Sequence, residues 1–148
     1  MKFSLELPRE ALSIPVIRRV LGDALRALGV SEDCVGDILV AASEACTNVI
    51  LHARASGDFE VTGSVDDGGC RLRIEDGGRG LRKAPPLTER DDLAESGRGI
   101  RIMRALVDDL SIDSAPEHGT VVHLHKRLTW RDEALIRRLD GRLMHSAG

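Results

Sequence analysis

Aromatic residues are scarce in this chain of 148 residues, which has two Phe, one Trp and no Tyr. Proteins that bind single-stranded nucleic acid stack the bases on aromatic side chains, and this sequence has almost none to offer. A strong positive charge is missing as well, because 21 Lys and Arg stand against 24 Asp and Glu, a formal net charge of -3. The two absences argue against direct binding of nucleic acid and against attraction to anionic lipid.

Cysteine is also sparse. Cys34, Cys46 and Cys70 are odd in number and lack the spacing of a metal site. Stable disulfides belong mainly to oxidising compartments. We therefore predict small core residues in a reducing compartment, with a reactive thiol as the less favoured alternative.

We expect no targeting segment at the start of this sequence. Its first ten residues carry charges where a signal peptide needs an apolar stretch, and we count no apolar run long enough to cross a membrane. Hydrophobic residues make up 42% and charged residues 30%, and the length suits one domain. We expect a cytoplasmic globular protein without membrane attachment.

Residues 35–52 show the period of a buried helix. One apolar stripe follows that period: Val35, Ile38, Leu39, Ala42, Cys46, Val49 and Ile50. Glu44 and Asn48 lie one turn apart on the other side, where Val40, Ala41 and Leu51 are their neighbours. A carboxylate and an amide among apolar residues predict part of a site, although two solvated or mutually paired side chains are the simpler alternative.

Periods of two and 3.6 residues alternate along the rest of the chain. The period of two predicts strands in five places: residues 3–7, 59–65, 70–74, 110–113 and 120–125. The longer period predicts a helix from Ser13 to near Gly29, and Ser31 is placed to cap the helix that follows. We predict an α+β fold, a two-layer α/β sandwich in which helices cover one face of a mostly antiparallel sheet.

Three further segments complete the chain. Residues 81–96 contain two prolines and an acidic cluster, and we interpret them as a loop or lid. A short helix from Ile100 is predicted to open on the glycines just before it. Helical spacing in residues 130–144 predicts a C-terminal helix.

Three glycine-bearing segments follow the helix of Glu44 and Asn48. They read Asp76-x-Gly78-x-Gly80, Gly97-x-Gly99 and Gly119-Thr120. Each alone is a weak signal, because glycines mark ordinary turns far more often than ligand sites. Together and in this order they resemble the ATP-binding fold shared by DNA gyrase, a heat-shock chaperone, sensor histidine kinases and mismatch-repair ATPases.

Within that superfamily, the small size and the segment Gly97-Arg98-Gly99-Ile100 look most like the bacterial anti-sigma-factor serine/threonine kinases. The resemblance covers about residues 3–128. It implies an ATP-binding kinase domain at residues 1–128, of the histidine-kinase-like ATPase fold, and leaves residues 129–148 as a C-terminal helical tail.

The resemblance implies a role for each matching position. Glu44 would assist phosphoryl transfer as a base or by orienting water, and Asn48 would help to coordinate Mg²⁺. Both residue types suit the task, since Mg²⁺ prefers oxygen ligands and a carboxylate accepts protons. Asp76 would accept a hydrogen bond from the exocyclic amine of adenine, and Gly78 and Gly80 would let the backbone approach the base.

The phosphate side is implied by the second glycine segment. Gly97, Arg98, Gly99 and Ile100 would face the triphosphate of ATP, with exposed N–H groups at the start of a helix. Thr120 would support the adenine pocket beside the aspartate.

The implied function is that of an ATP-dependent kinase acting as an anti-sigma factor. Such a protein phosphorylates a small anti-anti-sigma partner of the STAS type, sequesters a sigma factor and can form a homodimer. The main alternative is a non-catalytic partner-switch module that binds ATP as a structural ligand. A metal-dependent hydrolase built on His123 and His125 is disfavoured, because their spacing brings no third ligand.

Overall fold

One antiparallel sheet and three helices make up residues 1–52, 57–76, 89–115 and 119–131, the part of the chain described in this computed structural model. The strands are β1 (Lys2–Pro8), β2 (Asp58–Asp66), β3 (Gly69–Asp76), β4 (Asp109–Ala115) and β5 (Gly119–Lys126). The helices are α1 (Ser13–Leu28), α2 (Glu32–His52) and α3 (Glu89–Leu106).

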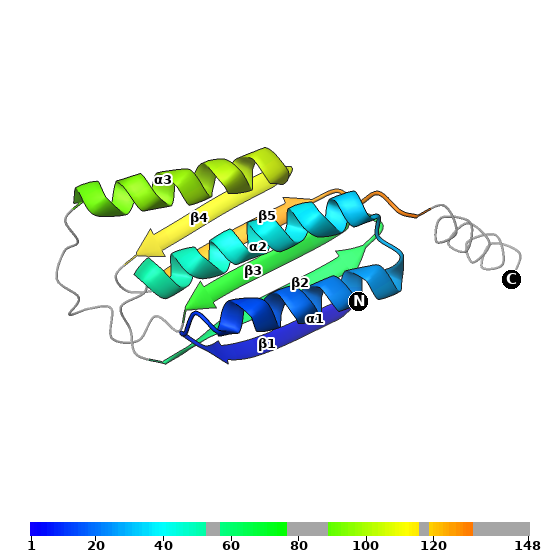
Figure 1. The fold of residues 1–148 in the computed structure, drawn as a ribbon, viewed down its shortest axis with the longest axis horizontal. Helices are drawn as coiled ribbons and strands as arrows, with labels where there is room; N and C mark the ends of the chain where they lie inside the picture. The colour runs from blue at the N-terminus through cyan, green and yellow to red at the C-terminus, as the bar shows by residue number, and fades with distance from the viewer. Residues whose placement is uncertain (53–56, 77–88, 116–118, 132–148) are drawn as a thin grey trace, which may run out of the picture.

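The sheet has the order β1-β2-β3-β5-β4, and every neighbouring pair is antiparallel. Figure 1 shows the three helices on the same face of the sheet, with α2 between α1 and α3. The predicted α+β sandwich is confirmed, and each of the five predicted strands lies within an observed one.

The core lies between the sheet and the helices, and α2 is its central element. Most of the predicted stripe on this helix is buried, although Ile50 is only partly so. Ala41 was placed on the wrong side, because it is fully buried whereas Val40 and Leu51 are exposed. The reason is that α2 packs against two helices as well as the sheet, so its buried arc is wider than a single stripe.

The predicted C-terminus of α1 and the predicted N-terminus of α2 are confirmed. Gly29 closes α1 in the left-handed conformation at φ 92°, and its N–H donates to the carbonyls of Arg26 and Leu25. The hydroxyl of Ser31 accepts a hydrogen bond from the backbone N–H of Cys34 at 3.4 Å, which is the expected cap of α2.

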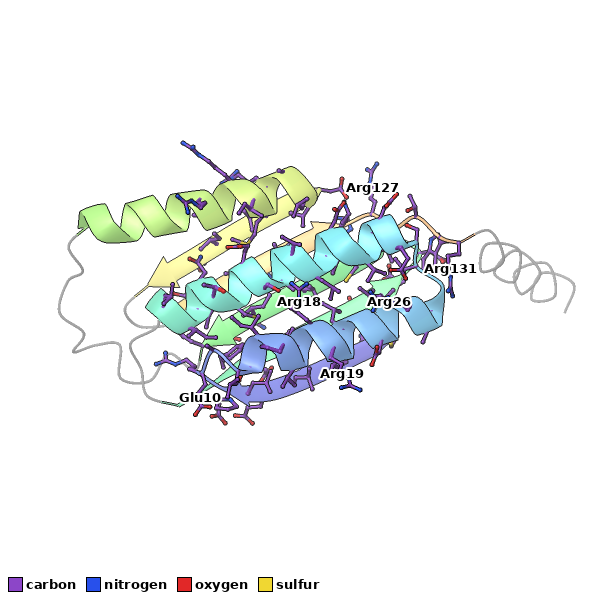
Figure 2. All side chains as sticks on the ribbon, in the orientation of Figure 1. Glu10, Arg18, Arg19, Arg26, Arg127 and Arg131 are labelled. Carbon is purple, nitrogen blue, oxygen red and sulfur yellow. The ribbon has the colours of Figure 1, made fainter. Side chains whose placement is uncertain are left out.

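The segment after β5 is joined to the loop between α1 and α2. The N–H of Ser31 donates to the carbonyl of Thr129 at 2.9 Å, and the N–H of Arg131 donates to the carbonyl of Gly29 at 2.8 Å. The guanidinium of Arg131 also donates to the carbonyl of Arg26 at 3.0 Å. Both residues are labelled toward the right of Figure 2. The rest of the predicted C-terminal helix lies outside the described residues.

Helix α3 starts earlier than predicted. It begins at Glu89, so residues 89–96 are helical rather than part of a loop. The residues of this stretch include Glu, Arg, Leu and Ala, which favour helix, whereas a glycine within a helix costs only about 1 kcal/mol. The remaining part of the predicted lid, residues 81–88, lies outside the described residues.

Helix α2 contradicts the expectation that no apolar run in the sequence is long enough to cross a membrane. Over Glu32–Leu51 it is long and apolar enough to cross a membrane, with a mean hydropathy of 1.5. The same helix packs between α1, α3 and the sheet, and 50% of this stretch is buried there. A central core helix meets the same criteria of length and composition, so this finding is weak support for a membrane span.

Candidate functional site

Glu44 contacts the glycine segment of α3. A Cβ atom at Gly99 would lie 3.0 Å from Oε2 of Glu44, so the carboxylate rests against the glycine backbone. Glu44 and Asn48 are both partly buried on α2, one turn apart. The sequence predicted these residues and the glycine separately, and the structure brings the glutamate and the glycine together.

Asp76 contacts the start of β5. It is the last residue of β3 and only 1% exposed, and Thr120 on the neighbouring strand is 6% exposed. Gly119 has a φ of +73°, and a Cβ atom there would overlap the carboxylate of Asp76. Glycine is therefore required at position 119 both for its backbone conformation and for the close approach of the aspartate.

The two contacts lie toward the same end of the molecule. Strand β3 runs toward this end and its antiparallel neighbour β5 starts from it, as does α3, while α2 finishes there (Figure 1). The polar side chains of the site thus come from α2, the end of β3 and the start of β5, and the glycine backbone comes from α3.

Two hydroxyl groups on α2 donate to carbonyls of the same helix, and one of them also joins α2 to α1. Ser43 Oγ donates to the carbonyl of Leu39 at 2.7 Å, and Thr47 Oγ1 donates to the carbonyl of Ser43 at 2.8 Å. Arg18 of α1 donates from Nη1 to Ser43 Oγ at 2.8 Å, and Figure 2 shows this side chain between the two helices. These residues were missed in the sequence, although Ser43 and Thr47 directly precede Glu44 and Asn48 at the same four-residue spacing.

The remaining glycine-segment residues that were predicted for the site lie on α3 or outside the described residues. Arg98 is exposed, and Ile100 is partly buried and packs against the core. Gly97 lies within α3. Gly78 and Gly80 lie outside the described residues.

The early start of α3 also bears on the expected contact between phosphate and the backbone N–H groups of the second glycine segment. The N–H groups of Gly97 and Gly99 lie inside the helix, where N–H groups bond to the helix's own carbonyls. The prediction that they are exposed at a helix start was wrong for this structure. A role for this segment toward phosphate stays a prediction.

Histidines do not form a metal cluster with other ligand residues anywhere in the described ranges. His123 is exposed on β5, and His125 lies two residues further on, with Nδ1 3.4 Å from Asp109 Oδ2 and Nε2 2.9 Å from the carbonyl of Gly68. They share the sheet face opposite the helices and lie away from Glu44 and Asp76.

The cysteines are buried and free, as predicted. Burial raises the pKa of the Cys46 thiol and of the Cys70 thiol to about 12. Both are therefore protonated near neutral pH, and a protonated thiol is a poor nucleophile.

Comparisons with known proteins identify the family of the chain. Residues 7–126 match the model of the histidine kinase-like ATPase domain. The chain is 32% identical to the anti-sigma F factor of Bacillus subtilis (strain 168), over 87% of this chain and 95% of that protein. It is 31% identical to the anti-sigma F factor of Clostridium botulinum (strain Eklund 17B / Type B), over 85% of this chain and 94% of that one.

A solved structure has a similar fold. The crystal structure of the RsbU and RsbW domains of Rv1364c from Mycobacterium tuberculosis aligns with a TM-score of 0.67 and 23% identity. The match covers 86% of this chain and 32% of that one. At this identity the match supports the fold alone.

Proposed function

Because the chain belongs to the histidine kinase-like ATPase family and, within it, to the anti-sigma F factors, we propose that it is an ATP-dependent serine/threonine kinase that acts as an anti-sigma factor. The observation that carries the proposal is the pair of contacts at one end of the fold. Glu44 lies against Gly99, and Asp76 lies against Gly119.

The residues at this end fit a magnesium nucleotide. Asp76 presents a buried carboxylate, which accepts hydrogen bonds and so suits an amine of the base. Gly119 has no side chain, which lets this carboxylate lie against the backbone at the start of β5. Asn48 offers an amide oxygen, the ligand type that Mg²⁺ prefers, and is the residue that we assign to the metal.

The chain's own part in the reaction is proton transfer and positioning. Bound ATP and Mg²⁺ would supply the phosphoryl group and the charge that stabilises its transfer. Glu44 accepts the proton of the attacking serine or threonine hydroxyl of the partner, whose oxygen bonds to the γ-phosphorus as ADP leaves. The segment Gly97, Arg98, Gly99 and Ile100 lies on the phosphate side, and Thr120 supports Asp76.

The proposed partners follow from the relatives' name, anti-sigma F factor. A sigma factor is held in one state, and a STAS-type anti-anti-sigma protein is the phosphoryl acceptor in another. A phosphate adds between about 1.5 and 2 negative charges at neutral pH, which can separate the second complex. We place the protein in the cytoplasm, with the kinase domain at residues 1–128, residues 129–148 as its tail, and a homodimer as its state.

Transfer from labelled ATP to a candidate anti-anti-sigma protein tests the proposal. Wild type should label the partner in the presence of Mg²⁺, and Asn48→Ala should lose most of this labelling. Asp76→Asn should weaken nucleotide binding itself, because the amide has no negative charge and keeps only one of the two oxygens that can accept from the adenine amine. Absence of labelling by wild type with a partner that it demonstrably binds would contradict the kinase.

Glu44→Ala separates the kinase from a module that only binds ATP. A kinase should keep its nucleotide affinity in this variant and lose transfer by about 100-fold or more, the usual contribution of a general base. If wild type and Glu44→Ala bind ATP alike and neither transfers, nucleotide occupancy alone is the function.

A further inference from the structure

Lys126 joins three elements at the end of β5 that lies away from the candidate site. It is the last residue of this strand, and its side chain is only 17% exposed. Its Nζ donates to the carbonyl of Leu106, the last residue of α3, at 2.7 Å. The same Nζ lies 3.4 Å from Oδ2 of Asp37 on α2. We call these three residues the lysine brace.

Each contact of the lysine brace suits the chemistry of its members. The last four carbonyls of a helix have no N–H partner inside the helix, so the carbonyl of Leu106 can accept from Lys126. The negative end of the helix dipole lies at the same place and favours a cation. Asp37 supplies the opposite charge that a largely buried ammonium group needs.

Two more hydrogen bonds hold the turn after α3 to the end of β5. The N–H of Asp108 donates to the carbonyl of His125 at 2.9 Å. Asp108 Oδ2 accepts from the N–H of Arg127 at 2.6 Å. The C-terminal end of α3 is therefore attached to the sheet, and Lys126 extends this attachment to α2.

The lysine brace and the site lie at matching levels of α2 and α3. Asp37 precedes Glu44 by seven residues on α2. Leu106 follows Gly99 by seven residues on α3. Seven residues are close to two helical turns, so each pair shares one side of its helix and spans about 10.5 Å of its length. Because α2 runs toward the site and α3 runs away from it (Figure 1), the two helices are joined twice at the same spacing.

We propose that the lysine brace sets the position of α3 along α2 and thereby keeps Gly99 against Glu44. Glycine has no side chain to interlock with α2, so the contact at the site does not fix this position by itself. Buried Met103 packs α3 against the core, but a methionine side chain adapts to small shifts. The ion pair and hydrogen bond of Lys126 fix the position two turns away, on the same rigid helices.

Lys126 is thus a positioning residue that acts on Glu44 through α3. This role rests on the proposed function, in which Glu44 accepts the proton of the attacking hydroxyl.

Phosphoryl transfer by Lys126→Met tests this role. Methionine has a side chain of similar length but no charge and no N–H donor. The rate at saturating ATP and partner should fall at least about 10-fold, because a misplacement of about 1 Å can cost about 100-fold. Nucleotide affinity should change less than about 2-fold, since Asp76 lies outside the lysine brace. Lys126→Arg restores a charged donor and should recover most of the rate.

Asp37→Asn gives a second measure of the same network. It removes the charge that holds Lys126 and should lower the rate by a smaller factor, because Lys126 still donates to Leu106. The variant with both substitutions should be no slower than Lys126→Met, since residues of one network do not act independently. Losses that multiply would contradict the lysine brace.

The NMR signal of the Gly99 amide is a readout that needs no kinase activity. This signal should shift in Lys126→Met and return in Lys126→Arg, while the signal of Gly119 at the start of β5 stays in place. An unmoved Gly99 signal in Lys126→Met would overturn the inference. If wild type transfers no phosphate, the proposed function fails, and the Gly99 signal still decides whether Lys126 positions α3.

Arg26→Met is the matched control, because it removes another ion pair of α2, the one with Glu32 at 3.0 Å on the side of α1. Transfer and the Gly99 signal should keep their wild-type values in this variant. Circular dichroism at the assay temperature should show every variant folded, so that slower transfer is not a loss of structure. Equal losses of rate in Arg26→Met and Lys126→Met would assign the effect to general stability and overturn the inference.

Discussion

At the scale of single residues, Gly119 is the position where the site depends most directly on the absence of a side chain. Its φ of +73° disfavours any other residue, and a Cβ atom would overlap the carboxylate of Asp76. Gly119→Ala should lower the free energy of unfolding by roughly 1–3 kcal/mol and also displace Asp76, which weakens nucleotide binding. Thermal unfolding and titration with a fluorescent nucleotide measure the two effects.

Gly36→Ala is the control for this prediction. Gly36 lies within α2 and is exposed, and a Cβ atom there would meet nothing within 4 Å. This variant should be more stable by about 0.5–1 kcal/mol, because alanine favours helix over glycine. Equal effects of the two substitutions would contradict the role given to Gly119.

The buried cysteines make a second prediction at this scale. Because burial raises the pKa of Cys46 and of Cys70 to about 12, both thiols should resist alkylation in the folded protein near neutral pH. Their neutral forms are favoured by folding, so their contribution to stability is present below the ordinary pKa of 9.0. It is lost as the pH rises from there toward 12. Mass spectrometry of alkylated peptides, with and without denaturant, tests the first statement, and unfolding at increasing pH tests the second.

Residue chemistry was easier to predict than residue contacts. Glu44 and Asn48 stood out because polar groups interrupt an apolar pattern, and Asp76 stood out because it opens a glycine-bearing segment. The contact of Glu44 with Gly99 joins segments 55 positions apart, the difference between 99 and 44. Local pattern carries no information on such a distance, which depends on how α2 and α3 pack.

At the scale of elements, the cap of α2 is a testable support of the site helix. Ser31→Ala removes the acceptor of the Cys34 N–H and should cost about 1 kcal/mol of stability. Ser31→Asp keeps an acceptor at the cap and should lose less. Urea unfolding of the three proteins gives the comparison, and an equal loss in both variants would assign the effect to the neighbouring Thr129 instead.

The junction of α1 and α2 was predicted well from its capping residues, whereas the start of α3 was predicted poorly. Gly29 and Ser31 identified the junction of α1 and α2 in advance. The sequence has Thr88 just before α3, a residue type that caps helices, but the interpretation followed the two glycines instead and placed the start of the helix at Ile100. Glycine weakens a helix by about 1 kcal/mol, which tertiary contacts readily offset.

At the scale of the whole molecule, nucleotide binding should be visible as stability. A ligand that binds only the folded state at 100 times its dissociation constant adds about 2.7 kcal/mol. For a domain of this size that corresponds to a rise of roughly 5–10 °C in the melting temperature. Wild type should show this rise with ATP and Mg²⁺, and Asp76→Asn should show little of it at the same concentration. A rise of equal size in both proteins would place the nucleotide elsewhere.

The hydrogen bonds between residues 29–31 and 129–131 also bear on where the folded unit ends. Ser31 and Thr129 are 98 positions apart, so losing their contact frees both the start of α2 and the exit of β5. A gene shortened at codon 128 would therefore yield a protein that frays at the junction of its first two helices. Expression of the isolated kinase domain should retain at least the residues through Arg131.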